Sequence, residues 1–424
     1  MRKNEKKEKK EWNAAFGRRA LLKAGIAIGA MQFAAPFIIS ARGETPFKIG
    51  MVDPETGTYA ALGGNEIKGA RMALKEINAK GGIAGRQVDL VVEDSAADVS
   101  QSVQKVNKLI DQEKVTFLMG AVSSAVAKAD SQAAHLQGKL YMVTGGHTDP
   151  VTGSQCHWST FRICSTTYML AAAIAKTLYD KFGKRWYFIT PDYAFGHTEQ
   201  AAFAELLKGM GGTVLGNALA PLGTTDFSSY LISARQAKPD ALIVLTAGND
   251  LVNTLKQATQ FGLPKEMAIG GGLLELEVLA ALPPEARYGW WTFEWYWDQP
   301  KVPHVREFVA AYRKANADAY PTARSWFGYA GLHALALAAN EAKSVDPVKV
   351  ARALEGMVLP PRVALEPDGP FFRKGDHQLM TTLFPGEVNG KGTYPNLFNV
   401  AKTVAGKDLA LSVKADGCKL DYGA

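Results

Sequence analysis

Four stretches near the start of the body indicate the fold of this chain: FKIGMV at 47–52, NEIKGARMALKEINA at 65–79, KGG at 80–82 and VDLVV at 88–92. The first and last are short apolar runs, which predicts two buried strands. Between them Ile67, Ala70, Leu74 and Ile77 recur at spacings of three and four residues, which predicts a helix that the glycines then end. Strand, helix and strand in this order predict parallel pairing in an α/β sheet.

The same alternation continues along the chain in two series. The first series adds strands at 116–119 and 140–143 and helices over 99–110 and 124–136. The second has strands at 186–189, 213–215, 241–245 and 267–269, with helices centred near 175, 203, 231 and 255. Two series predict two sheets covered by helices, and 424 residues exceed what one core of about 250–300 residues holds. Ligands of open α/β sheets bind beyond the carboxyl ends of the strands, so the loops there are the candidate site.

The region after residue 289 changes character. Residues 290–298 read WWTFEWYWD, which is dense in aromatic side chains that either line a cleft or pack in a core. Helices are expected over 303–316 and 323–342. The last sixty residues are rich in turn residues, which favours a return crossing and short strands.

The first forty residues resemble an export signal. Residues 1–41 hold nine basic and three acidic residues, which is +6 of the chain's net charge of +7. Arg18-Arg19 precedes Leu21-Leu22-Lys23 and an apolar run to Ile39, an order typical of a twin-arginine signal. We expect cleavage near 41–43 and a periplasmic location; an uncleaved anchor is the alternative. The near-neutral remainder argues against a nucleic-acid partner.

Ordered segments of the body resemble the leucine/isoleucine/valine-binding proteins of the type I periplasmic fold. The segments are Lys48–Val52, Thr56–Gly63, Gly69–Ala73, Gly85-Arg86, Gly120–Ser124, Thr148–Pro150, Phe161-Arg162, Asp192–Gly196 and Trp297-Asp298. The resemblance implies two Rossmann-like lobes joined by three crossing segments, near 161–162, 292–297 and 359–365, with a ligand cleft between the lobes. It divides the chain into a signal (1–43), an N-terminal lobe (44–162 with 294–360) and a C-terminal lobe (163–293 with 361–424).

The resemblance also implies a function. The family feeds ABC importers for branched-chain amino acids, urea, short amides and aromatic or other small acids, so the partners would be such a ligand and the importer's membrane subunits. A monomer without cofactor is expected. The alternatives are an extracytoplasmic ligand sensor and, less in keeping with the pattern, an exported α/β hydrolase or amidase; the sequence has no nucleophile elbow, zinc-protease motif or P-loop.

The candidate binding residues follow predicted strands. Ser123 and Ser124 begin a helix, where hydroxyls and free N–H groups can hold an anion or simply cap the helix. The resemblance implies that Ser124 holds the carboxylate of the ligand. It also implies that Gly146 offers a backbone carbonyl and Thr148 a hydroxyl, although this stretch has turn chemistry in any case.

Aromatic candidates lie in both lobes. Tyr59 follows the first strand of one lobe, and Tyr193 and Phe195 follow a strand of the other, so that their rings could hold the ligand between them. Asn249 lies in a loop of small residues where relatives place further contacts.

The chain departs from amino-acid binders of the family at Gly271-Gly272, where they carry an acidic residue for the ammonium group of the ligand. Either Glu275 or Glu294 replaces that residue, or the ligand lacks an ammonium group. We favour a carboxylic acid with an apolar or aromatic body, or a small amide.

Of three cysteines, Cys156 and Cys418 lie in polar loop-like surroundings and Cys164 in an apolar strand. We therefore expect a disulfide between Cys156 and Cys418. His147, Cys156, His157 and Cys164 match no zinc spacing, and no metal site is expected.

Overall fold

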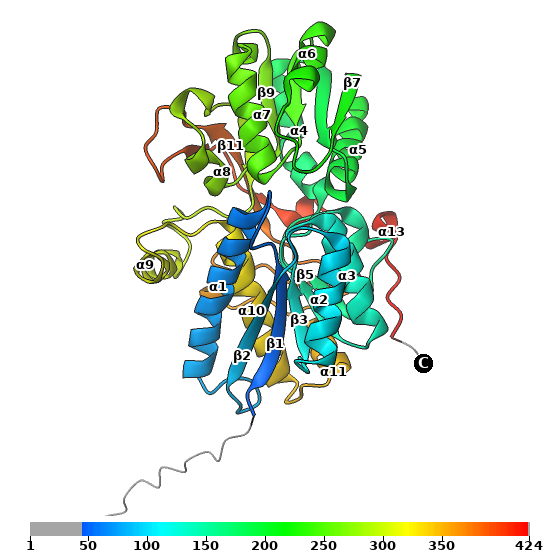
Figure 1. Ribbon diagram of the computed structural model, residues 1–424, viewed down its shortest axis with the longest axis vertical. Helices are drawn as coiled ribbons and strands as arrows, with labels where there is room; N and C mark the ends of the chain where they lie inside the picture. The colour runs from blue at the N-terminus through cyan, green and yellow to red at the C-terminus, as the bar shows by residue number, and fades with distance from the viewer. Residues whose placement is uncertain (1–44, 423–424) are drawn as a thin grey trace, which may run out of the picture. The chain divides into compact units, whose positions relative to one another are not determined.

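A computed structural model describes residues 45–422, and these form one compact unit with two sheets, one parallel and one mixed (Figure 1). The predicted twin-arginine signal lies outside the described residues. Within residues 45–422, no helix is both long enough and apolar enough to cross a membrane.

The first lobe is built on a five-stranded sheet of order β2-β1-β3-β4-β5, all parallel. Its strands are β1 (Phe47–Asp53), β2 (Val88–Asp94), β3 (Phe117–Gly120), β4 (Leu140–Val143) and β5 (Thr160–Arg162). Between them run α1 (Ala60–Ala79), α2 (Val99–Asp111), α3 (Ser124–Leu136) and the short η1 (Asp149–Val151). Ile67, Ala70 and Ile77 of α1 are buried, which confirms the predicted apolar stripe. The helix begins five residues earlier than its apolar spacing indicated.

The second lobe is built on a sheet of order β12-β11-β10-β9-β8-β6-β7, with β13 paired to β11. Strands β6 to β10 are parallel, and β11, β12 and β13 add antiparallel pairs. The strands are β6 (Arg185–Pro191), β7 (Thr213–Ala220), β8 (Ala241–Val244), β9 (Ala268–Leu273), β10 (Trp290–Phe293), β11 (Thr382–Val388), β12 (Phe398–Val400) and β13 (Val404–Ala405). The helices are α4 (Thr167–Phe182), α5 (Ala194–Gly209), α6 (Ser228–Ala237), α7 (Gly248–Gln260), η2 (Leu263–Lys265), α8 (Leu276–Ala281) and η3 (Pro284–Ala286).

The chain then returns to the first lobe, which Figure 1 shows as yellow and orange helices beside the blue strands. These are α9 (Val305–Ala315), α10 (Ala323–Glu341), α11 (Pro347–Leu354) and α12 (Pro361–Ala364). Helix α10 packs closely on α1, since a Cβ at Gly328 would lie 1.9 Å from the carbonyl oxygen of Glu66 and one at Gly69 would lie 1.8 Å from that of Ser325. This close approach places Glu66 and Arg324 side by side.

The third crossing comes later in the chain than the predicted 359–365. Leu365, Phe372 and Leu379 still pack in the core of the first lobe, whereas Phe384 packs in that of the second. The chain therefore changes lobe between Leu379 and β11. The predicted lobe boundaries stay a proposal. On this packing, the first lobe would end near residue 381 and not at residue 360.

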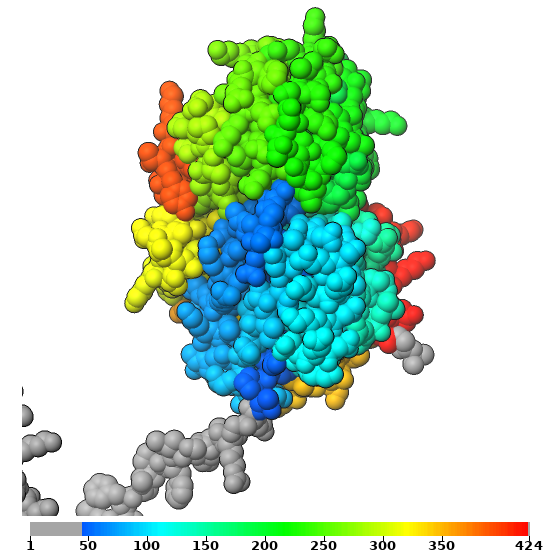
Figure 2. All heavy atoms as spheres, in the orientation of Figure 1, coloured from blue at the N-terminus to red at the C-terminus, as the bar shows by residue number. Residues whose placement is uncertain are grey.

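The C-terminal tail follows with η4 (Gly406–Asp408) and α13 (Val413–Asp416). Cys418 in this tail is joined to Cys156 by a disulfide, with the two Cα atoms 5.6 Å apart, and Cys164 is a buried free thiol. The ring of Tyr422 stacks on that of Trp158 in the first lobe. The tail is thereby fixed to the first lobe, where it is drawn in red (Figure 2).

Candidate functional site

The carboxyl ends of strands from both sheets meet where the two lobes are in contact. Tyr59 precedes α1 in the first lobe and Tyr193 precedes α5 in the second, and their hydroxyl oxygens are 2.5 Å apart. Beside them the N–H of Asn249 donates to the carbonyl of Thr58 at 3.3 Å. Blue atoms of the first lobe touch green atoms of the second on the visible face in Figure 2. The two lobes are therefore closed on each other at this point.

A small cavity of about 10 Å³ remains between the lobes. It is lined by Tyr59, Leu62, Val122, His147, Tyr193, Phe195, Ala247, Leu273 and Arg324. A cavity needs about 10–15 Å³ to hold a single water molecule. The side chains of the two lobes therefore fill almost the whole cleft.

Three of the predicted binding residues line this cavity: Tyr59, Tyr193 and Phe195. Burial raises the pKa of both tyrosine hydroxyls, and the contact between the two hydroxyls raises that of Tyr59 further. Both tyrosines therefore stay neutral hydrogen-bonding groups at physiological pH. Whether these rings hold a ligand stays a prediction.

Ser123 and Ser124 lie at the start of α3 just outside the lining. The Ser124 hydroxyl accepts hydrogen bonds from the backbone N–H groups of His147 (3.1 Å) and Thr148 (3.2 Å). Ser123 occupies the N-cap position without a capping hydrogen bond from its side chain. Ser124 thus holds the loop after β4 in place and has its own O–H left to donate.

The loop after β4 is fixed by Arg162 as well. The Arg162 guanidinium, fully buried, donates to the carbonyls of Gly146 (3.2 Å) and Thr148 (2.6 Å). The Thr148 hydroxyl lies 3.1 Å from that of Thr198 in α5, across the lobe contact. In this closed arrangement the Gly146 carbonyl and the Thr148 hydroxyl, both predicted as ligand contacts, bond to the protein itself.

His147 is a cavity residue that we did not predict as a ligand contact. Its Nε2 lies 2.6 Å from Glu294, whose other oxygen accepts from the Ser165 N–H (2.8 Å) and hydroxyl (2.7 Å). Burial would raise the pKa of Glu294, but His147 and these donors hold it below its usual value. Glu294 is therefore an ionised carboxylate already fully engaged within the protein.

Arg324 is the second cavity residue that we did not predict. Its Nε donates to Glu275 at 2.6 Å and its Nη1 to Glu66 at 3.0 Å and to the Gly145 carbonyl at 3.2 Å. Glu66 belongs to the first lobe, whereas Glu275 directly precedes α8 in the second. Arg324 thus links the lobes by an ion pair that is almost completely buried.

Acidic groups surround this arginine in excess. Burial raises the pKa of Glu66. Burial and the nearby Glu66 carboxyl together raise the pKa of Asp53 well above its usual range. Both shifts favour the protonated forms, and a proton on either group reduces the repulsion between the two carboxyls. Sequence periodicity could not have located this cluster because its members come from β1, α1, α10 and the segment before α8.

The aromatic segment at 290–298 packs in the cores. Trp291 and Trp295 are buried in the second and first lobe, respectively, and the Trp295 indole donates to the Leu365 carbonyl at 2.8 Å. None of the eight-residue stretch 290–297 belongs to the cavity lining. Of the two interpretations of these aromatic residues, packing at the crossing is the one that the structure shows.

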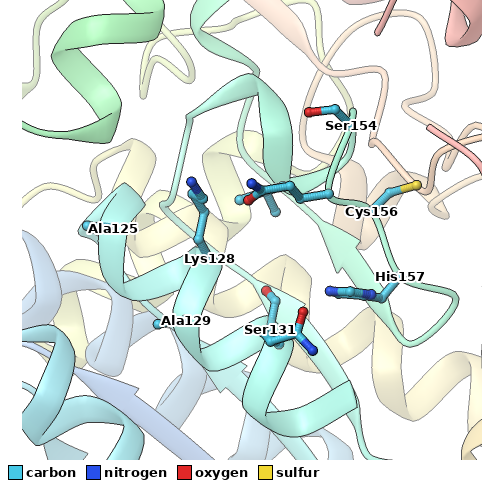
Figure 3. Close-up of a pocket in the computed structure, with 10 residues that line it drawn as sticks. Ala125, Lys128, Ala129, Ser131, Ser154, Cys156 and His157 are labelled. Atoms are coloured by element: carbon cyan, nitrogen blue, oxygen red, sulfur yellow. The ribbon is translucent and has the colours of Figure 1, made fainter. Parts of the chain in front are cut away.

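A larger hollow of about 590 Å³ lies on the first lobe away from the lobe contact (Figure 3). Lys128 and Ser131 project from α3 toward the loop that carries Ser154, Cys156 and His157. It includes none of the predicted ligand contacts and is open to solvent. Over residues 45–422, no three His, Cys, Asp or Glu side chains are grouped so as to hold a metal ion.

Comparisons with known proteins agree with this architecture. A family model described as periplasmic binding protein matches residues 46–393. The Leu/Ile/Val-binding protein homolog 7 of Brucella suis is 27% identical over 341 residues, which cover 77% of this chain and 85% of that protein.

Two solved structures are similar in three dimensions. A periplasmic binding protein from Burkholderia mallei has a TM-score of 0.81 at 27% identity, covering 88% of this chain and 98% of the other. A solute binding protein of an ABC transporter from Rhodopseudomonas palustris, in complex with 3,4-dihydroxybenzoic acid, has a TM-score of 0.76 at 23% identity, covering 85% and 96%.

Proposed function

Because this chain belongs to the periplasmic binding protein family, of the leucine/isoleucine/valine-binding type, we propose that it is the substrate-binding component of an ABC importer. It captures a small carboxylate-bearing solute by closing two lobes and presents it to the membrane subunits of the importer. Members of this family are solute-binding proteins that act outside the cytoplasm.

The observation that carries the proposal is the meeting of Tyr59 and Tyr193 at the strand ends of opposite lobes. Two tyrosines, a phenylalanine, a histidine and an arginine converge there on one small cavity. Aromatic faces with a few polar groups between them are what small-molecule sites offer. Hinge movement of the lobes would enlarge this cavity to admit a ligand.

The ligand class rests on the names of the relatives. The Brucella protein is named for leucine, isoleucine and valine, and the Rhodopseudomonas protein holds 3,4-dihydroxybenzoic acid. These ligands share a carboxylate and an apolar body. We propose the same combination here, with delivery to the periplasm by the twin-arginine signal of residues 1–43.

A ligand screen tests the proposal. The protein purified from the periplasm is heated with a panel of amino acids, aromatic acids, amides and urea, and product formation is followed by mass spectrometry. A ligand at a hundred times its Kd should raise the free energy of unfolding by about 2.7 kcal/mol and remain chemically unchanged. No stabilising ligand, or conversion of one to a product, would overturn the binding function.

A further inference from the structure

The C-terminal tail crosses from the second lobe to the first, after the third crossing has brought the chain back to the second. It leaves β13, where Ala405 pairs with Thr382 of β11. Gly406 packs so closely on the second lobe that a Cβ there would lie 2.7 Å from Cε of Met169 in α4. Since the tail ends on the first lobe, a fourth covalent segment joins the lobes. This segment lies beyond residues 46–393, which the family model matches.

The far end of the tail is fixed to the first lobe by a side chain and by a covalent bond. Arg373 follows Phe372, which is buried in the core of the first lobe. Its Nη1 donates to the Leu411 carbonyl at 2.8 Å. The disulfide then joins Cys418 to Cys156 in the loop after η1. Both ends of the crossing segment are therefore fixed, one on each lobe.

The disulfide is the strongest of the anchors on the first lobe. Helix α13 has four residues, and none of them is buried, so it adds little apolar burial. Beyond the disulfide, the Tyr422 ring stacks on Trp158 and its hydroxyl donates to Glu355. Such contacts contribute about 0.5–1.5 kcal/mol each. The covalent bond, in contrast, keeps the tail on the first lobe throughout any movement of the lobes.

The segment between the two sets of anchors is short. Only five residues lie between Ala405 and Leu411, and in the closed arrangement they are compact, because the N–H groups of Leu409 and Ala410 both donate to the Gly406 carbonyl. Fully extended, the six Cα-to-Cα steps of this segment reach about 20 Å, at roughly 3.3–3.6 Å each. The two anchoring points cannot separate further while both ends stay fixed.

The same segment also packs where the lobes meet. Leu409 and Ala410 lie against a cluster of buried side chains that includes Tyr59 of the first lobe and Phe195 of the second. Movement of one lobe relative to the other therefore acts on this segment directly.

We propose that residues 406–422 form a strap that limits how far the two lobes separate, and that the disulfide between Cys156 and Cys418 holds this strap in place. The strap is compact when the lobes are closed. As the lobes part, residues 406–410 extend until their length stops the movement. Resting on the proposed binding function, the strap also raises the affinity for a ligand, because fewer open conformations compete with the closed form that binds it.

Distances between the lobes test the limit on opening. Spin labels are attached to p-acetylphenylalanine at Gln104 in α2 and at Ile232 in α6, one exposed position in each lobe. This chemistry needs no thiol and leaves the disulfide intact. Pulsed electron–electron double resonance then measures the distance distribution. The double variant Cys156→Ser, Cys418→Ser should add a population at longer distances that the wild type lacks.

A second variant separates the length of the strap from the loss of the cross-link. About six Gly and Ser residues inserted between Lys407 and Asp408, which are both exposed, add up to about 20 Å of reach and keep the disulfide. This variant should show the same longer distances. The same insertion after Lys391, in the exposed turn between β11 and β12 of the second lobe, is the matched control and should keep the wild-type distribution.

Two results would overturn the strap. One is a wild-type distribution in both variants. The other is a shift in the cysteine variant alone, which would assign the effect to a destabilised first lobe and not to the length of the segment. Circular dichroism and unfolding curves confirm that each variant is folded.

A ligand found in the panel screen tests the effect on affinity. Both variants should bind it about two- to tenfold more weakly than the wild type, since a smaller fraction of the protein is in the closed form. Equal affinities in all proteins would refute this effect. If no compound of the panel binds, the binding function falls, whereas the distance measurements still decide whether the strap limits opening.

Discussion

The hydroxyl oxygens of Tyr59 and Tyr193 lie 2.5 Å apart, although 134 residues separate them in the chain and each belongs to a different lobe. Tyr59 is buried and Tyr193 half-buried, and the Tyr59 ring packs against α7, where a Cβ at Gly248 would lie 2.8 Å from Cδ1 of Tyr59. Gly248 has a φ of +56°, which together with this close approach explains why a glycine stands there. This contact is one of several between the lobes, and a single substitution can probe its share in closure.

Tyr193→Phe removes the hydroxyl contact between the lobes and keeps the ring. The hydrogen bond contributes about 0.5–1.5 kcal/mol to closure, so the ligand-free protein should populate more of an open form. Small-angle scattering should then give a larger radius of gyration for the variant than for the wild type. Tyr288→Phe, which loses a hydroxyl bond to Leu255 within the second lobe, should leave the radius unchanged; an unchanged radius for both would show that the tyrosine contact does not influence closure.

Ser124→Ala leaves the N–H groups of His147 and Thr148 without their acceptor. The free energy of unfolding should fall by about 1–3 kcal/mol, and a carboxylate ligand should bind more weakly by a similar amount if Ser124 donates to it. Ser123→Ala is the matched control for stability, because the Ser123 side chain makes no capping bond. Urea unfolding and calorimetry measure the two effects separately; loss of stability with unchanged affinity would remove Ser124 from the binding site.

Asp130→Asn should stabilise the protein in a way that depends on pH. Burial raises the pKa of Asp130 to about 7, against hydrogen bonds from Ser102 and Tyr141 that lower it. The folded protein therefore binds this proton more tightly than the unfolded chain, and stability is lost as pH rises from about 4 to about 7. The variant should exceed the wild type in free energy of unfolding by ~1–4 kcal/mol at pH 8 and by clearly less at pH 5. An equal difference at both values would show that Asp130 does not titrate in this range.

Removal of the disulfide should destabilise the chain without exposing the remaining thiol. The bond joins residues 262 positions apart, and loss of such a cross-link costs about 2–5 kcal/mol. The double variant Cys156→Ser, Cys418→Ser should unfold at lower urea concentration than the wild type. In both proteins the buried Cys164 should react with a thiol reagent only after unfolding; fast reaction in the folded state would contradict its burial.

Much of the architecture could be read from local patterns. Apolar runs and three-to-four spacing located β1 to β4 of the first sheet, β6 to β9 of the second and most helices, and α3 and β4 begin and end at the predicted residues. Strand β7 was predicted too short, because seven of its eight residues are exposed or half-buried at the sheet edge and carry little apolar signal. Core packing places the third crossing later in the chain than predicted, because turn-rich residues mark loops without saying which core they cover.

Local sequence patterns were enough to predict two α/β series, a site at the strand ends, and aromatic side chains in the loops after two of those strands. These follow from hydrophobic periodicity and turn chemistry, which act between residues close in the chain. Only the tertiary structure decided that Tyr59 meets Tyr193, that Ser124 holds the loop of His147, and that Arg324 joins Glu66 to Glu275 across the lobes. Charge pairing in a buried cleft depends on which charged groups folding brings within about 3 Å of each other. The spacing of residues along the chain and the composition do not predict such distances between groups that are far apart in the sequence.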